Sequence, residues 1–277
     1  MSTAVAERQD QTDLCADLRA QIATQAVELP MLPQTASEVI TLASAEECDA
    51  RALAGLIQHD PILATEVLRV ANSPLFRSDN QIVSLQQAIA RMGVGRVRDI
   101  ALAIALKTNL FKPSKYTATL HASWRHAVGT AAWAREVARL CRVNAELAYL
   151  GGLLHDIGVP VVLQLLERQV AQALPAADVR ALLDELSPQA GCALIRHWGL
   201  PDVLAKVVEE CRNPDVCEPT ASIVGTARWL DDVDANVDPE ELIAAPELLR
   251  MNLYPEDIAR LWKVRPRIQS MVEALSL

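Results

Sequence analysis

The chain has 277 residues, of which 51% are hydrophobic and only 4% aromatic, and its formal net charge is −9. That length and apolar content allow either one large domain or two modest ones, each with a buried core. The acidic balance argues against a nucleic-acid-binding role, because phosphate backbones would repel the molecule as a whole. The best local basic patch combines Arg91, Arg96 and Arg98 with Lys107. A solvated helix face explains it more simply, because no aromatic residues are interleaved with it.

The cysteines and the N-terminus indicate the compartment. The six cysteines are Cys15, Cys48, Cys141, Cys192, Cys211 and Cys217, and no two of them form a Cys-x-x-Cys pair. The first residues are polar where a secretory signal would need an apolar stretch. We therefore expect reduced thiols, a cytoplasmic location and no membrane association. The strongly apolar run 100–106 is far too short to cross a bilayer.

The first half of the chain is expected to be helical with clear breaks. Helices are predicted over residues 13–27, 35–43, 50–58, 61–71 and 84–92. Asp60 before Pro61 is a favoured helix start, since the carboxylate can accept from free N–H groups and proline fits the first turn. Ser84 with Gln87 matches a capping box. Residues 100–106 (IALAIAL) alternate in size, but alanine is a poor strand former, so we predict a buried helix there.

The second half continues the helical pattern. Helices are predicted over residues 120–140, 145–157, 161–174, 177–186, 188–197, 201–211 and 221–230, with a break at Pro188. The acidic segment 231–241 is expected to be a solvated linker to two or three closing helices. The predicted regions are a lead-in at 1–28, a helical subdomain at 29–113, a second at 114–230, and C-terminal helices at 231–277. The fold class is all-α, with an N-terminal helical bundle packed on a second helical domain.

Two adjacent residues, His155 and Asp156, are the strongest chemical signal. A histidine and an aspartate at the end of a helix can offer a nitrogen and an oxygen to one metal ion. Gly151 and Gly152 lie one turn earlier and let another helix approach closely. Upstream, His126 shares a helix face with apolar residues and should point toward the same core.

These residues resemble the HD superfamily of metal-dependent phosphohydrolases, in which an earlier His, an HD pair and a later Asp bind one metal. The resemblance to one branch, the HDOD output domains, covers about residues 29–230. It is carried by residues 29–33 (LPMLP), 57–76 (IQHDPILATEVLRVANSPLF), 84–93 (SLQQAIARMG), 124–126 (WRH), 150–158 (LGGLLHDIG) and 198–201 (WGLP). The resemblance implies an N-terminal helical bundle joined to an HD-like helical domain.

At several positions where the family carries metal ligands, this sequence has other residues, and these differences affect whether the site can bind a metal. Ser187 and the pair Cys211-Arg212 stand where family members with a fuller site carry histidines, and Arg228 stands where the closing Asp belongs. A guanidinium about 5 Å from a divalent ion, at an effective dielectric of ~20, repels it by roughly 6–7 kcal/mol. We therefore expect no metal at His126, His155 and Asp156. A buried polar anchor is expected instead, with Asp156 accepting from one of the two histidines.

The resemblance therefore implies a non-catalytic bacterial regulatory module that needs no cofactor. It would act by binding other signalling proteins, with a small nucleotide as a second ligand class. The predicted groove is lined by Asn72, Ser73, Phe76, His126, His155 and Asp156. The alternative is a divalent-metal phosphohydrolase acting on a nucleotide or cyclic dinucleotide. Two further pairs are discounted: His59-Asp60 as a helix cap, and Cys211 with Cys217 because a lone cysteine pair is too few ligands for zinc.

Overall fold

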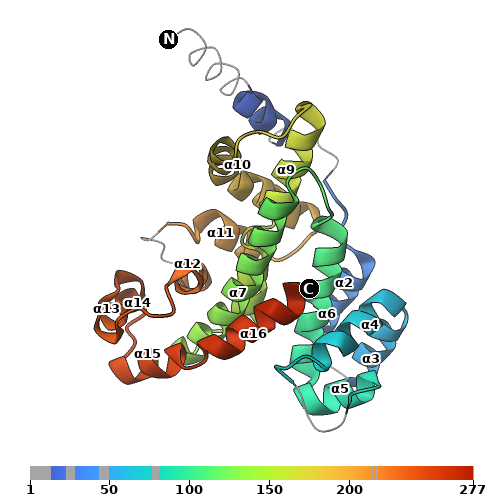
Figure 1. The fold of residues 1–277 in the computed structure, drawn as a ribbon, viewed down its shortest axis with the longest axis vertical. Coiled ribbons are helices and arrows are strands. Elements are labelled where there is room, and N and C mark those ends of the chain that lie inside the picture. Colours follow the sequence, from blue (N-terminus) through green and yellow to red (C-terminus); the bar gives the residue numbers. More distant parts are fainter. Residues whose placement is uncertain are drawn as a thin grey trace.

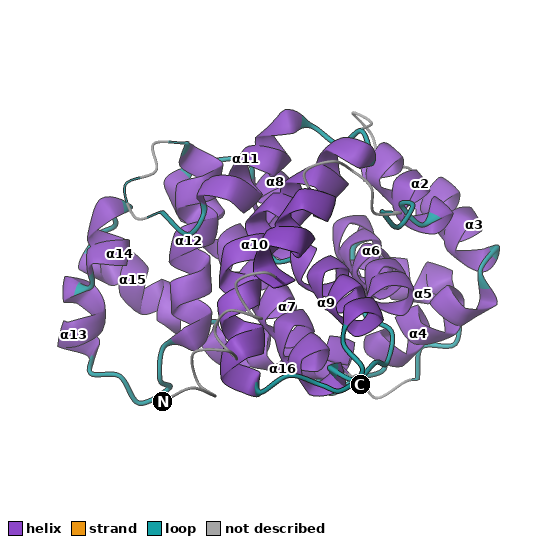
Figure 2. Ribbon diagram, turned by 90° about the horizontal axis from the view of Figure 1, so that it is seen from above, coloured by secondary structure: helices purple, strands orange, loops and turns teal. Residues whose placement is uncertain are grey.

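The structure is a computed structural model that describes residues 14–22, 29–43, 50–76, 81–213, 215 and 218–276. Every regular element in these ranges is a helix, which confirms the all-α class (Figure 2). Cys217, one half of the discounted zinc pair, lies outside the described residues.

The N-terminal half is a bundle built around one long buried helix. Its helices are α2 (Gln34–Ala43), α3 (Ala50–Gln58), α4 (Pro61–Ala71), α5 (Leu85–Met92) and α6 (Val94–Leu110). Helices α2 to α5 all pack on α6 (Figure 1). Residues 97–106 of α6 are all buried, so the prediction of a buried helix over residues 100–106 is correct.

Both predicted N-caps of this half are present. Asp60 Oδ1 accepts from the backbone N–H groups of Ile62 and Leu63, each at 3.0 Å. Ser84 Oγ accepts from the backbone of Gln87 at 3.2 Å, while the Gln87 side chain accepts in return from the N–H of Val83. The carboxylate of Asp60 is therefore used as a cap and not as a ligand.

The second half is arranged around the central helix α7. Its helices are α7 (Thr117–Cys141), α8 (Ala145–Leu154), α9 (Gly158–Gln169), α10 (Ala176–His197), α11 (Asp202–Glu210) and α12 (Pro219–Asp232). Helices α8 and α12 pack along α7. A Cβ at Gly152 would lie 2.7 Å from the Cα of Ala131 on α7. The glycine before the His-Asp pair therefore permits the close helix approach that was expected.

Helix α10 corrects one prediction. We expected two helices separated at Pro188, but α10 runs continuously from Ala176 to His197. Proline removes one N–H, which leaves the carbonyl of Asp184 without its usual helical donor. A guanidinium nitrogen of Arg212 lies 3.5 Å from that oxygen. Burial of the apolar face on both sides of Pro188, including Leu186 and Leu194, stabilises the helix across the gap.

Helices α8 and α9 form a longer apolar stretch than residues 100–106. The helix that we predicted over residues 145–157 ends earlier, at Leu154, and a short turn separates it from α9. Together, Ala145–Gln169 is the one stretch of the described chain that is long and apolar enough to cross a membrane, and 83% of its most apolar window is buried inside the protein. Such burial is typical of core helices. The cytoplasmic location stays a prediction.

The C-terminal helices pack back on both halves. They are α13 (Pro239–Ala244), α14 (Pro246–Arg250), α15 (Pro255–Trp262) and α16 (Arg265–Ser276). Helix α16 lies along α7 and also contacts α6 (Figure 1). The carbonyl of Leu275 accepts from Lys107 Nζ at 3.1 Å and from Trp124 Nε1 at 3.0 Å. These two bonds join the end of the described chain to α6 and to α7.

A buried charge cluster links α6 to α7 and α8. Asp99 on α6 accepts from Arg135 of α7 at 2.5 Å and from its neighbour Arg98 at 3.2 Å. Arg98 also pairs with Glu146 of α8, and the guanidinium of Arg135 lies 4.0 Å from the ring centre of Tyr149. Arg98 is 8% exposed. Its assignment to a solvated basic helix face is therefore wrong, because Asp99 and Glu146 compensate its charge inside the fold.

Candidate functional site

His155 and Asp156 lie in the turn between α8 and α9. His155 Nδ1 is 2.7 Å from the carbonyl oxygen of Gly152, and since a carbonyl only accepts, Nδ1 carries a proton and donates. Burial lowers the pKa of His155, so the ring is neutral and Nε2 presents a lone pair. Nε2 lies 3.4 Å from Asp156 Oδ2 and has no hydrogen-bond partner.

His126 of α7 is the second histidine of the group. Its ring lies edge-on to that of His155, with centroids 5.2 Å apart. His126 Nδ1 donates to Asp231 Oδ2 at 2.9 Å, and Asp232 Oδ1 is 3.7 Å away. Burial lowers the pKa of His126, but the hydrogen bond to Asp231 and the nearby carboxylates outweigh burial and raise it above 6.5.

Asp231 and Asp232 were missed by the sequence analysis. They belong to the last turn of α12, not to a solvated linker, and Asp231 lies in the notch that Gly129 leaves on α7. Asp231, and not Asp156, accepts from His126. A signal was available in the sequence, because Asp231 lies one helical turn after the apolar residue Ala227 and therefore shares the helix face that packs inward.

Asp156 is paired with a cation. Arg212, just after α11, donates through Nη2 to Asp156 Oδ1 at 2.8 Å. Burial raises the pKa of Asp156, but nearby groups that include the guanidinium groups of Arg212 and Arg228 outweigh burial and hold this pKa well below its ordinary value. The positive charge of Arg228 contributes, after burial, to the lowered pKa of His155.

The other positions singled out in the sequence offer no ligand atoms. Ser187 is buried and its hydroxyl donates to the carbonyl of Leu183. Burial raises the pKa of Cys211 to about 11, which disfavours the thiolate form that metals bind.

The metal that the HD pattern implies can be tested against these residues. Among the described residues, the donor atoms of His126, His155 and Asp156 lie within 4.8 Å of one another, and so do those of His126, Asp231 and Asp232. In the first group, however, Arg212 occupies one oxygen of Asp156, and Arg228 adds a second positive charge. This first group fits a resident divalent ion poorly, because the positive charges of Arg212 and Arg228 already compensate the carboxylate of Asp156.

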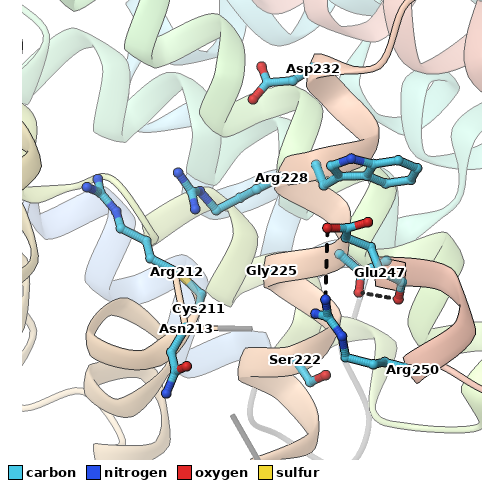
Figure 3. Close-up of a pocket in the computed structure, with 11 residues that line it drawn as sticks. Cys211, Arg212, Asn213, Ser222, Gly225, Arg228, Asp232, Glu247 and Arg250 are labelled. Carbon is cyan, nitrogen blue, oxygen red and sulfur yellow. Dashed lines mark hydrogen bonds and ion pairs between the residues drawn. The ribbon is translucent and has the colours of Figure 1, made fainter. Parts of the chain in front are cut away.

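Two cavities flank this group. One, of about 570 Å³, lies beside His126 and extends along α7 and α16. The other, of about 260 Å³, lies between the end of α11, α12 and α14 and is lined by Arg212, Arg228 and Arg250 (Figure 3). Asp232 lines both cavities.

The predicted groove residues from the first half lie elsewhere. Asn72 closes the loop after α4: its side chain donates to the carbonyl of Ile82 and accepts from the N–H of Ile82, both at 2.8 Å. Ser73 and Phe76 belong to the same loop, and none of the three lines either cavity beside His126. The structure brings together His126, His155 and Asp156 but does not bring the loop residues to them.

The helical architecture and the His-Asp turn define an all-α protein with an HD-like core. More specifically, the chain belongs to the HDOD family, whose domain model matches residues 29–214. The same fold is found in a candidate metal-dependent phosphohydrolase of Shewanella amazonensis SB2B (TM-score 0.74, 19% identity, 96% of this chain and 99% of that one). It is also found in a candidate signal transduction protein of Marinobacter aquaeolei VT8 (TM-score 0.66, 22% identity, 98% of this chain and 66% of that one).

A relative of uncharacterised function in Treponema pallidum (strain Nichols) is 24% identical over 233 residues, which is 77% of this chain. The match spans only 45% of that relative's length. At these identities the likeness to the solved structures shows the fold and not the activity.

Proposed function

We propose that the chain is a non-catalytic regulatory module of signal transduction, which acts by binding a partner protein and a small nucleotide. The ion pair between Arg212 and Asp156, 2.8 Å long, carries this proposal. It places a fixed positive charge on the carboxylate that the HD pattern would give to a metal. A metal would have to displace a partly buried, hydrogen-bonded guanidinium before it could bind.

The neighbouring residues support the same conclusion. Arg228 adds a second cation, and Cys211 and Ser187 supply neither a charged nor a free ligand atom. Proteins described as phosphohydrolase and as signal transduction protein share this fold, so the residues of the site must discriminate between the two classes. In this chain they favour the regulatory class.

A second candidate is a divalent-metal phosphohydrolase. One observation favours it: the unpartnered lone pair of His155 Nε2 faces an oxygen of Asp156, an arrangement in which a cation between the two atoms would be stabilising. His126 completes the same donor group.

Metal analysis separates the two candidates. The full chain, purified without chelators, is measured by elemental mass spectrometry and assayed with Mn²⁺ and a chromogenic phosphodiester. We expect substoichiometric metal and no turnover, with the same result for His155→Ala. Stoichiometric Mn, Fe or Ni that disappears in His155→Ala would overturn the non-catalytic proposal.

A further inference from the structure

Three arginines line the cavity between α11, α12 and α14, and they differ in how they are paired within the protein. Arg250 lies 4.0 Å from Glu247, and Arg212 binds Asp156. Arg228 makes no ion pair with any described residue, and its Nε–H is buried without a hydrogen-bond partner. This guanidinium therefore lines the cavity without a carboxylate close enough to form an ion pair with it, and an anion in the cavity would be attracted to it.

Arg212 contributes a second unused donor. Its Nη2 is bound to Asp156, but its Nε–H is also buried without a partner. In Figure 3 the side chains of Arg212 and Arg228 extend in the same direction from neighbouring segments. Two guanidinium groups that line the same cavity are a typical arrangement for binding several oxygens of one anion.

Acidic side chains line the same cavity. Asp232 and Glu247 line it, and both carry negative charge. They would repel a second phosphoryl group but can accept hydrogen bonds from hydroxyl or amino groups. The cavity volume of about 260 Å³ lies just below the range typical of drug-sized pockets, which favours a compact ligand.

We propose that this cavity binds a phosphate monoester, with Arg228 and Arg212 holding the phosphoryl oxygens and Asp232 and Glu247 accepting from the organic part. The inference rests on the proposed function, because it requires that Arg212, and not a metal, compensates Asp156. It narrows the ligand class from a small nucleotide to compact monoesters.

The test is isothermal titration of the full chain, treated with EDTA, at low ionic strength. The probes are inorganic phosphate and ribose 5-phosphate. We expect ribose 5-phosphate to bind more tightly than phosphate, and Arg228→Gln to weaken its binding by about tenfold or more. Arg260→Gln, a matched change at a side chain that is 75% exposed and outside the cavity, should leave binding unchanged.

Circular dichroism melts establish that each variant is folded, and Arg228→Lys provides a conservative second variant with intermediate binding. Equal affinities for wild type and both Arg228 variants overturn the inference, and so does an absence of binding to metal-free wild type. If no binding occurs and the protein also holds no metal, this inference fails alone. Binding that appears only after Mn²⁺ is added overturns both this inference and the proposed function.

Discussion

Arg212 and Asp156 form an ion pair of 2.8 Å that joins the end of α11 to the turn between α8 and α9. The same guanidinium reaches the carbonyl of Asp184, the oxygen that Pro188 leaves without a helical donor. One side chain therefore connects the His-Asp turn to the middle of α10.

The first prediction concerns the strength of this pair. Arg212→Gln leaves the carboxylate of Asp156 without its partner, and because Arg212 is partly exposed we expect a loss of about 2 kcal/mol in the free energy of unfolding. Urea denaturation at neutral pH measures it. Arg260→Gln serves as the exposed control, and an equal effect of the two changes would contradict the assignment.

The second prediction converts the site toward metal binding. Arg228→Asp replaces a cation by a carboxylate beside His155 and Asp156, which removes a repulsion of roughly 6–7 kcal/mol if the guanidinium lies about 5 Å from a divalent ion at a dielectric of ~20. We expect Mn²⁺ binding that wild type lacks, detected by titration calorimetry. Adding His155→Ala should abolish it. Identical Mn²⁺ isotherms for Arg228→Asp and wild type would contradict the prediction that Arg228 prevents metal binding.

The third prediction concerns pH. The pKa of His126 is raised in the folded protein above 6.5, mainly through Asp231, so the pair stabilises the fold fully below about pH 6.5 and loses this contribution as pH rises through the folded pKa. His126→Gln should therefore reduce the free energy of unfolding more at pH 6 than at pH 8.5. Urea denaturation of both proteins at the two pH values measures this. A pH-independent difference would show that the histidine is not charged in the fold.

The fourth prediction concerns the buried charge cluster. Asp99→Asn removes the negative charge that compensates Arg98 and Arg135, and we expect a loss of about 3–5 kcal/mol in the free energy of unfolding. Chemical denaturation provides the value. Glu136→Gln breaks only an i,i+3 pair with Arg139 near the surface and should cost under about 1 kcal/mol. Comparable losses in the two variants would argue against the cluster.

The fifth prediction uses two glycines. A Cβ at Gly152 would meet the backbone of α7, so Gly152→Ala should destabilise the protein by about 1–3 kcal/mol or more through overpacking. Gly55 lies inside α3 with open space around it, and Gly55→Ala should stabilise by about 0.5–1 kcal/mol. Thermal melts compare the stabilities of the two variants with that of wild type. A neutral Gly152→Ala would show that α8 can shift away from α7.

Much of the fold could be predicted from local signals. Caps at Asp60 and Ser84 and the apolar run 100–106 depend on short stretches of chain, and these predictions are confirmed. Pro188 misled the prediction because its effect depends on tertiary burial, which no local pattern records. Arg98 misled it for a similar reason: its compensating partner Glu146 is distant in sequence.

In the candidate site, too, some features could be predicted from the sequence, whereas others depend on contacts between distant residues. The group of His126, His155 and Asp156 could be assembled from a family pattern. The partners of these residues could not, because Asp231 and Arg212 reach them across 105 and 56 positions of the chain. Asn72 differs from these residues, since its side chain closes its own loop and it lines neither of the two cavities described beside His126.

Gly129 and Asp231 constrain each other during sequence divergence. The carboxylate of Asp231 occupies the space in which any side chain at position 129 would begin. Relatives that carry alanine or a larger residue at the position of Gly129 are therefore expected to lack an acidic residue at the position of Asp231. In such relatives the histidine corresponding to His126 would lose the partner that favours its charged form. The two positions should covary across the family, and that covariation would mark the lineages in which this histidine keeps its proton.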